Sequence, residues 1–235
     1  MMKNRVIILS GPSCVGKTPL LKALRRNHPQ INFVMPVLYS SRKARPGEKD
    51  GIDYHFRSAA EIQHLPSQKY IIEKVRQVWQ AIDIEEIADL VQTNSLLILE
   101  IYPTLAKKFS QNNIMQKYLH NFSITTIFIS PFIKEEISQI QQNMGYTSAA
   151  ETAAAIMSHK QVNRALKQGK ILSPDELNDI QVRAGKAWEE INMADSYDHL
   201  IINHDNEDSD NWRFSPPLGE AGKTLKTLID IITNK

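Results

Sequence analysis

The sequence is poor in cysteine and in charge of one sign. Cys14 is the single cysteine among 235 residues, which excludes an intrachain disulfide and a four-thiolate zinc site and suits a reducing compartment. The 28 lysines and arginines nearly balance the 26 aspartates and glutamates, leaving a net charge of +2. Because nucleic acids are held by broad uncompensated positive charge, we expect no nucleic-acid partner.

Long apolar runs are also missing. A membrane-spanning helix needs roughly twenty consecutive apolar residues, and the longest runs here, Leu96–Leu99 and Ile127–Ile129, are only as long as strands. The apolar run Val6–Leu9 is interrupted at once by Ser10-Gly11-Pro12 and is too short for a signal peptide. We therefore expect a cytoplasmic protein with no membrane partner.

What is present is the pattern of an α/β fold. With 42% hydrophobic residues, the chain can bury a sizeable core. Short runs rich in Ile, Leu and Val, separated by stretches long enough for helices, predict parallel strands covered on both faces. These runs are Val6–Leu9, Leu96–Ile101, Ile124–Ile129 and Leu200–Ile202. The chain between Leu9 and Leu96, and that from about 143 to 185, exceeds what a crossover needs, which indicates two insertions.

Turn and cap signals predict the local structure of the two insertions. The first contains Pro46-Gly47 and Asp50-Gly51, which predict a hairpin or surface loop. The second is alanine-rich over Ala149–Met157, and Ser173-Pro174-Asp175-Glu176 predicts an N-cap, a proline in the first turn and a capping glutamate. A last amphipathic helix is predicted over Lys223–Ile232.

A glycine-rich phosphate loop directly follows the first predicted strand. Glycine, four residues, glycine, lysine and a hydroxyl residue read from Gly11 to Thr18, and helical sequence follows at Leu20–Leu24. Main-chain N–H groups and a helix N-terminus can converge there on phosphate oxygens. Lys17 would add a point charge and Thr18 a ligand for Mg²⁺. The predicted ATP phosphate-binding residues are Gly11, Ser13, Cys14, Val15, Gly16, Lys17 and Thr18.

Cys14 within this loop has two interpretations. Its thiol could be made acidic by the helix N-terminus and be sensitive to oxidation. The alternative, which we favour, is that Cys14 only fills space in the loop.

A second phosphate site is indicated by two arginines and a tyrosine. Arg42 and Arg45 flank the predicted turn, and Tyr54 lies shortly beyond. Guanidinium groups bind phosphate oxygens in a planar, bidentate manner. From the residues alone, a solvated charged hairpin is an equally good interpretation.

The segment from Ser40 to Phe56 resembles the acceptor-phosphate segment of the guanylate kinase family, at the family's distance after the phosphate loop. Weaker similarity continues through Ile127–Pro131 and Tyr197–Asn203. The resemblance implies a P-loop NTPase-type parallel-sheet core flanked by helices, with an inserted nucleoside-monophosphate-binding subdomain and a helical lid. The implied core covers 1–36, 95–142 and 185–235, the acceptor subdomain 37–94 and the lid 143–184. The implied activity is Mg²⁺-dependent phosphoryl transfer from ATP to a nucleoside monophosphate, with GMP or dGMP favoured.

The resemblance also implies roles for single residues. Arg42, Arg45 and Tyr54 would bind the acceptor phosphate, and Glu73 would pair with guanine. Together with the two residues where the family has an aspartate pair, the implied acceptor-binding residues are Arg42, Arg45, Tyr54, Glu73, Glu100 and Tyr102. Arg183 falls on the family's second lid arginine, and Arg164, Lys167 and Lys170 could substitute for the other one. The implied catalytic set is Lys17, Arg183 and Arg164. Asn203 would border the adenine.

Departures from the family pattern keep other functions open. Gln80–Ile84 stands where the family has a Tyr-Gly-Thr or Tyr-Gly-Ser element, and Gln142–Gly145 stands where an arginine between glycines is expected. One alternative is a P-loop kinase for another nucleotide or a sugar phosphate, with a less polar pocket. That pocket would be lined by Leu38, Ile82, Ile84 and Tyr102. The other alternative is a catalytically weak, guanylate-kinase-like binding module.

Overall fold

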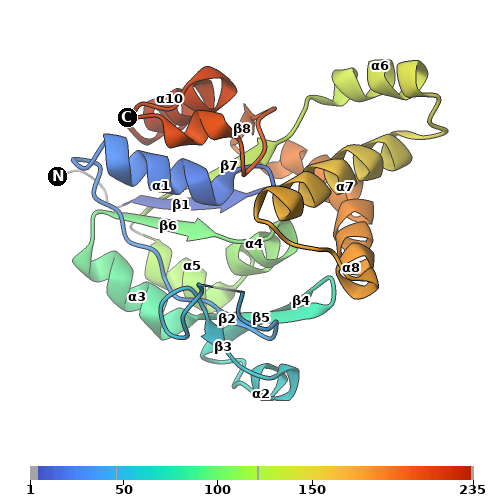
Figure 1. The fold of residues 1–235 in the computed structure, drawn as a ribbon. Coiled ribbons are helices and arrows are strands. Elements are labelled where there is room, and N and C mark those ends of the chain that lie inside the picture. Colours follow the sequence, from blue (N-terminus) through green and yellow to red (C-terminus); the bar gives the residue numbers. More distant parts are fainter. Residues whose placement is uncertain (1–4, 46, 121, 234–235) are drawn as a thin grey trace. The chain divides into compact units, whose positions relative to one another are not determined.

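The computed structural model describes residues 5–45, 47–120 and 122–233, which divide into two compact units (Figure 1). The first unit comprises Met1–Leu9 and Asn32–Thr126, and the second comprises Ser10–Ile31 and Ile127–Lys235. Among the described helices, none has an apolar stretch that would reach across a bilayer. The predicted limits of core, acceptor subdomain and lid stay predictions, and their outermost residues and Pro46 of the predicted turn lie outside the described residues.

Two parallel strands lie in the buried core of the first unit. Strand β1 (Arg5–Ser10) pairs in parallel with β6 (Leu96–Glu100), with Ile7 opposite Ile98. All four residues from Val6 to Leu9 have no exposed surface. A strand buried on both faces reads as a continuous apolar run, because both sets of alternating side chains need apolar neighbours.

The first unit also holds a mixed sheet of strand order β3-β2-β5-β4 (Figure 1). Its strands are β2 (Tyr39–Ser40), β3 (His55–Phe56), β4 (Tyr70–Val75) and β5 (Val78–Asp83). Strands β4 and β5 form a hairpin whose turn includes Arg76 at a φ of 58°. Strands β2 and β3 are parallel, so the predicted turn region between them is a surface loop and not a hairpin.

Three of the four described helices of the first unit begin at a side-chain cap, and the third along the chain begins at a proline instead. They are α2 (Ala59–Gln63), α3 (Ile84–Thr93), α4 (Pro103–Ser110) and α5 (Asn113–Leu119). Asp83 ends β5 and starts α3, because its carboxylate accepts the N–H groups of Glu85 and Glu86. Helix α4 packs against β4 and thereby borders the mixed sheet.

In the second unit, β7 (Ser123–Ser130) enters from the first unit and pairs in parallel with β8 (His199–Ile202). Together with β1 and β6, these strands confirm the apolar runs predicted as strands. The chain is therefore an α/β protein with a parallel-sheet core and a second, mixed sheet.

Helices make up most of the rest of the second unit. They are α1 (Lys17–Asn27), α6 (Lys134–Met144), α7 (Ala149–Lys167), α8 (Pro174–Gly185), α9 (Ala187–Asn192) and α10 (Gly219–Thr233), with 3₁₀ turns η1 (Met193–Ser196) and η2 (Asp210–Arg213). Ser173 caps α8 in a reciprocal capping box with Glu176, which confirms the predicted start. The predicted C-terminal helix is also confirmed, with Leu225 and Leu228 buried.

Candidate active site

Two glycines of the phosphate loop hold backbone that other residues would not tolerate. Gly11 has a φ of 148°, and a Cβ there would lie 2.3 Å from the carbonyl oxygen of Ile129. Gly16 has a φ of 87°, and its Cβ would lie 2.7 Å from the amide nitrogen of Asn203. The main chain of the loop is therefore pressed against β7 and the segment after β8, which only glycine permits.

The Lys17 side chain folds back onto the phosphate loop. As the first residue of α1, it extends its Nζ back to donate hydrogen bonds to the carbonyl oxygens of Gly11 and Pro12, both at 2.8 Å. The neighbouring Thr18 is exposed, whereas Cys14 and Val15 are buried and Ser13 is half-buried. The ammonium group is thus held at the loop, where an anion would meet it.

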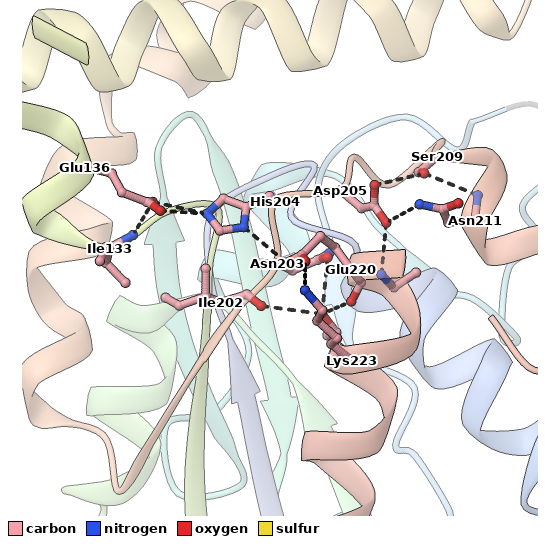
Figure 2. Close-up of polar contacts among 12 residues, drawn as sticks. Ile133, Glu136, Ile202, Asn203, His204, Asp205, Ser209, Asn211, Glu220 and Lys223 are labelled. Atoms are coloured by element: carbon pink, nitrogen blue, oxygen red, sulfur yellow. Dashed lines mark hydrogen bonds and ion pairs between the residues drawn. The ribbon is translucent and has the colours of Figure 1, made fainter. Parts of the chain in front are cut away.

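Asn203 supports the loop from the end of β8. It is fully buried, and its Nδ2 donates to the carbonyl oxygen of Val15 at 2.8 Å while its Oδ1 accepts from the Thr224 hydroxyl at 3.2 Å. Figure 2 shows Asn203 beside His204 and Asp205, from where the chain continues toward α10. The adenine-side role stays a prediction; the contacts themselves give Asn203 a supporting role at the loop.

Cys14 faces the lid-side helix α7. Arg164 of α7 points a guanidinium nitrogen at its sulfur, 3.7 Å away, and pairs with Glu207 at 2.9 Å. Burial raises the pKa of the Cys14 thiol, and the Glu207 carboxylate raises it further, outweighing the opposing effect of Arg164. A raised pKa favours the neutral thiol, and this direction agrees with the space-filling interpretation of Cys14.

Helix α7 binds the segment after β8 at successive turns. Besides the Arg164 pair, the buried Lys160 donates to the carbonyl oxygen of His204 at 2.7 Å, and Lys167 lies 3.8 Å from the Asp208 carboxylate. Sequence reasoning missed Lys160 and Glu207. The signal was available, because Lys160, Arg164 and Lys167 have the spacing of one helix face and an acidic segment follows β8.

Arg183, the other predicted lid cation, lies on α8. Its guanidinium group pairs with Asp179 at 2.8 Å, one turn earlier on the same helix. Its positive charge also lowers the pKa of Cys14, though less than Arg164 does. Both predicted lid arginines therefore lower the pKa of the same thiol, that of Cys14 in the phosphate loop.

In the first unit, Glu48 binds both arginines of the predicted acceptor-phosphate site, Arg42 and Arg45, which together are called the arginine clamp. Arg42 makes two hydrogen bonds to the Glu48 carboxylate, at 2.6 and 2.8 Å, and Glu48 also accepts the main-chain N–H of Arg45 at 2.8 Å. The Arg45 side chain is exposed. Sequence reasoning missed Glu48, because a carboxylate beside two arginines reads equally well as part of a solvated loop.

Tyr54 lies against Arg42, with the guanidinium carbon 4.9 Å from the ring centroid. Burial raises the pKa of the Tyr54 hydroxyl, and the nearby Glu100 and Tyr102 raise it further. The phenol is therefore a neutral hydrogen-bonding group at physiological pH. Those electrostatic couplings bring Glu100 and Tyr102 into the same cluster as the clamp.

Glu73 and Tyr102 each have a basic neighbour that the sequence did not reveal. Lys108 of α4 pairs with the Glu73 carboxylate at 2.9 Å and donates to the carbonyl oxygen of Ile72 at 2.6 Å. Arg76, at the tip of the β4–β5 hairpin, lies 4.8 Å from the centroid of the Tyr102 ring. The predicted acceptor residues thus gather in one unit.

The residues suggested for a less polar acceptor pocket belong instead to the core. Ile82 has no exposed surface, Ile84 is 1% exposed and Leu38 is 6% exposed. Side chains buried to this degree pack the sheet and α3, and Tyr102 alone of the four is only half-buried.

Comparisons with known proteins point to one family. A family model described as guanylate kinase matches residues 3–181. The chain is 28% identical to the guanylate kinase of Rickettsia bellii over 89% of this chain and 92% of the relative, and 29% identical to that of Aster yellows witches'-broom phytoplasma over 96% and 91%. A match of 45% identity with the guanylate kinase of Mycolicibacterium paratuberculosis spans only 30% of either chain.

A solved structure shares the fold. The crystal structure of guanylate kinase from Anaplasma phagocytophilum aligns with a TM-score of 0.57 at 20% identity, over 99% of this chain and 86% of the other. This similarity agrees with the parallel core and the second, mixed sheet described above.

Proposed function

The chain belongs to the guanylate kinase family of nucleoside monophosphate kinases, and from this premise we propose that it transfers the γ-phosphoryl group of ATP to GMP or dGMP. An oxygen of the acceptor phosphate attacks the γ-phosphorus of ATP, and the bond from that phosphorus to the β–γ bridging oxygen breaks. The products are ADP and GDP or dGDP. The proposal rests above all on the phosphate loop, whose strand, glycines and helix form one continuous anion-binding element.

On the ATP side, the chain supplies main-chain donors and cations. Amides of the loop from Ser13 to Gly16 would bind phosphate oxygens. Lys17 would exchange its bonds to Gly11 and Pro12 for the transferred and bridging phosphates, because an anion offers the ammonium group a stronger charge-assisted bond than a carbonyl does. Arg164 and Arg183 would neutralise the charge that spreads over the transferred group.

Mg²⁺ is part of the proposal, with Thr18 as its ligand from the chain. The donor set fits, because Mg²⁺ keeps several waters and takes one or two protein ligands besides phosphate oxygens. A single exposed hydroxyl at the start of α1 is the kind of ligand such a site requires. When bound, the ion would offset negative charge on the ATP phosphates.

On the acceptor side, Arg42, Arg45 and Tyr54 would hold the monophosphate. Glu48 orients Arg42, and a neutral Tyr54 can donate a hydrogen bond to a phosphate oxygen without repelling it. Because phosphoryl transfer depends on positioning and charge neutralisation more than on covalent chemistry, these groups suffice for the acceptor half of the reaction. In-line transfer further requires the two phosphates to meet when both substrates are bound.

The second candidate function is phosphoryl transfer to a different acceptor. Glu100 and Tyr102 replace the aspartate pair of the family, so another phosphorylated acceptor is the main alternative, and a nucleotide-binding module without turnover is the third. The cytoplasm, where ATP and GMP are made and used, is the proposed location.

One assay separates these functions. ADP formation is measured with ATP, Mg²⁺ and each of GMP, dGMP, AMP, UMP, CMP and a set of sugar phosphates. Turnover with GMP and dGMP supports the proposal, and turnover only with another acceptor contradicts it. If no acceptor leads to ADP formation but ATP binding is measurable, the result supports the binding module.

A further inference from the structure

The segment after β8, residues 203–218, is long for a connection between a strand and a helix. Most connections in compact domains take about 2–6 residues, and much longer ones commonly serve a function. Two contacts hold this segment beside the phosphate loop. Asn203 donates to the carbonyl oxygen of Val15, and a Cβ at Gly16 would lie 3.2 Å from the ring of Trp212. The acidic part of the segment therefore has both of its ends fixed against the loop.

Two acidic residues of this segment make different contacts. The Asp205 carboxylate accepts from the Ser209 hydroxyl at 3.1 Å and from the Asn211 side chain at 2.9 Å (Figure 2). Asp205 thus shapes the segment itself. Among the described residues, the Glu207 carboxylate bonds instead to Arg164 of α7, at 2.9 Å. Glu207 therefore contacts a residue of the proposed ATP site and not its own segment.

Arg164 joins the Glu207 carboxylate to the phosphate loop. The Nη1 atom that donates to Glu207 also lies 3.7 Å from the Cys14 sulfur, so one guanidinium group spans the gap between carboxylate and loop. The side chains of Arg164 and Glu207 are only 21% and 18% exposed. Lys167 and Asp210, by comparison, are 51% and 65% exposed. Solvent therefore screens the pair beside the loop less than its neighbour on the same two elements.

The negative charge of Glu207 reaches the loop. Burial raises the pKa of the Cys14 thiol most, and the Glu207 carboxylate raises it further. A carboxylate that disfavours a thiolate at this position also disfavours other anions there, because both effects are charge repulsion. Under the proposed function, the anions that come to the loop are the phosphates of ATP, and Arg164 is one of the cations that would neutralise them.

We propose that Glu207 is an internal competitor of the ATP phosphates, which occupies Arg164 until they displace it and thereby weakens ATP binding. The inference rests on the proposed function, because that function gives Arg164 its role. A guanidinium group can bind phosphate oxygens through two parallel charge-assisted hydrogen bonds, so the exchange is favourable once ATP has entered. Glu207 does not touch ATP in this scheme and acts only through Arg164.

Glu207→Gln tests the competition, because it keeps the shape of the side chain and removes its charge. We expect ATP to bind about threefold to tenfold more tightly to this variant. Binding is measured by calorimetry with Mg²⁺ and without an acceptor, so that it does not depend on turnover. Tripolyphosphate is the second probe, because it lacks the nucleoside, and it should gain by the same factor. A gain for ATP alone would overturn the proposal, since the effect would then lie at the nucleoside.

Asp210→Asn is the matched control. It removes one negative charge from the same segment, but Asp210 lies 3.8 Å from Lys167 and leaves Arg164 untouched. ATP should bind this variant within about twofold of the wild type. A gain equal to that of Glu207→Gln would show that only the net charge of the segment matters, and would overturn the role of Glu207.

Arg164→Gln tests whether Glu207 acts through this arginine. Once Arg164 is removed, adding Glu207→Gln should change ATP binding by no more than about twofold, because the carboxylate no longer occupies a cation that ATP needs. A gain as large as in the wild-type background would contradict the proposal. Circular dichroism verifies the fold of each variant.

The outcomes separate the two proposals. If ATP binds Glu207→Gln no more tightly than the wild type, the role of Glu207 is overturned even where the wild type phosphorylates GMP. If the expected gains appear in a protein that forms no ADP with GMP, the role of Glu207 is supported and the proposed phosphoryl transfer is refuted. If neither the wild type nor Glu207→Gln binds ATP, both proposals are overturned.

Discussion

The phosphate loop and the mixed sheet both carry groups suited to an anion or a nucleotide, but they hold these groups in different ways. In the loop, Lys17 donates to Gly11 and Pro12, and Asn203 donates to Val15. Main-chain carbonyl groups of the loop are therefore held by hydrogen bonds from these two side chains. At the mixed sheet, Arg42 of the loop between β2 and β3 depends on Glu48, and the hydroxyl of Ser40 in β2 has no partner among the described residues.

The difference lies in what specifies each site. The loop would bind through its main chain, so its geometry follows from glycines at fixed positions and tolerates change in most side chains. The mixed sheet would bind through side chains, each of which needs its own partner to hold its orientation. We therefore expect substitutions of Gly11 or Lys17 to lower turnover most, and substitutions in and beside the sheet to change which acceptor is used and how tightly.

Lys17→Ala should have the largest effect on the reaction. Removing one preorganised cation at the transferred phosphate lowers kcat by about 100- to 1,000-fold. The measurement is ADP formation with ATP and GMP, with circular dichroism to verify the fold. Lys22→Ala is the control, since Lys22 is exposed on the same helix. Unchanged turnover in the Lys17 variant would contradict the role assigned to it.

Gly11→Ala should disrupt the loop through sterics alone. An added Cβ would lie 2.3 Å from a main-chain oxygen of Ile129, and neither group can move without shifting β7 or the loop. We expect the free energy of unfolding to fall by several kcal/mol. Backbone strain alone, at a left-handed position with open space around it, would cost only about 1–2 kcal/mol.

Gly145→Ala is the matched control for this prediction. Gly145 has a φ of 69°, and a Cβ there would meet nothing within 4 Å. Chemical denaturation of both variants gives the comparison. Equal losses at the two positions would show that close packing of the loop against β7 is not what requires glycine at position 11.

Arg45→Ala should act on the acceptor alone. Its exposed guanidinium group would meet only the acceptor phosphate, so KM for GMP should rise about tenfold while KM for ATP stays unchanged. Steady-state kinetics with each substrate varied in turn provides the measurement. The neighbouring and equally exposed Lys43→Ala is the control, and a matching rise in KM there would mean that only general positive charge matters.

The parts of the fold that follow local rules could be predicted from the sequence. Continuous apolar runs identified β1, β6, β7 and β8, and the Ser173 capping box identified the start of α8. The parallel pairing of β2 and β3 was not predicted, because strands of two residues carry too little periodicity to be recognised.

The residues that orient the site were not predicted from the sequence. Glu48, Lys108 and Glu207 each act by pairing with a predicted site residue. Lys108 is far in sequence from Glu73, and Glu207 is far from Arg164, so no local pattern links them.

His204→Gln should have the smallest effect and should depend on pH. The ring contacts the carboxylates of Glu136 and Glu220, both at 3.1 Å (Figure 2). Burial alone lowers the pKa of His204, but hydrogen bonds to these carboxylates outweigh it and raise the pKa above its usual value. Because the folded pKa is raised, protonated His204 stabilises the protein below about pH 6.5, and this stability is lost as pH rises through the folded pKa.

Melting temperatures at pH 5.5 and pH 8.5 test this prediction. The ring is 46% exposed, so solvent screening limits the pair to less than about 1 kcal/mol. The wild type should therefore lose slightly more stability than His204→Gln between the two pH values, while His159→Gln, on the exposed side of α7, should follow the wild type. A His204→Gln profile parallel to the wild type would mean that the two carboxylates do not bind a protonated ring. The segment after β8 would then be held by the contact of Asn203 with the loop and by the contacts of Lys160, Arg164 and Lys167 from α7.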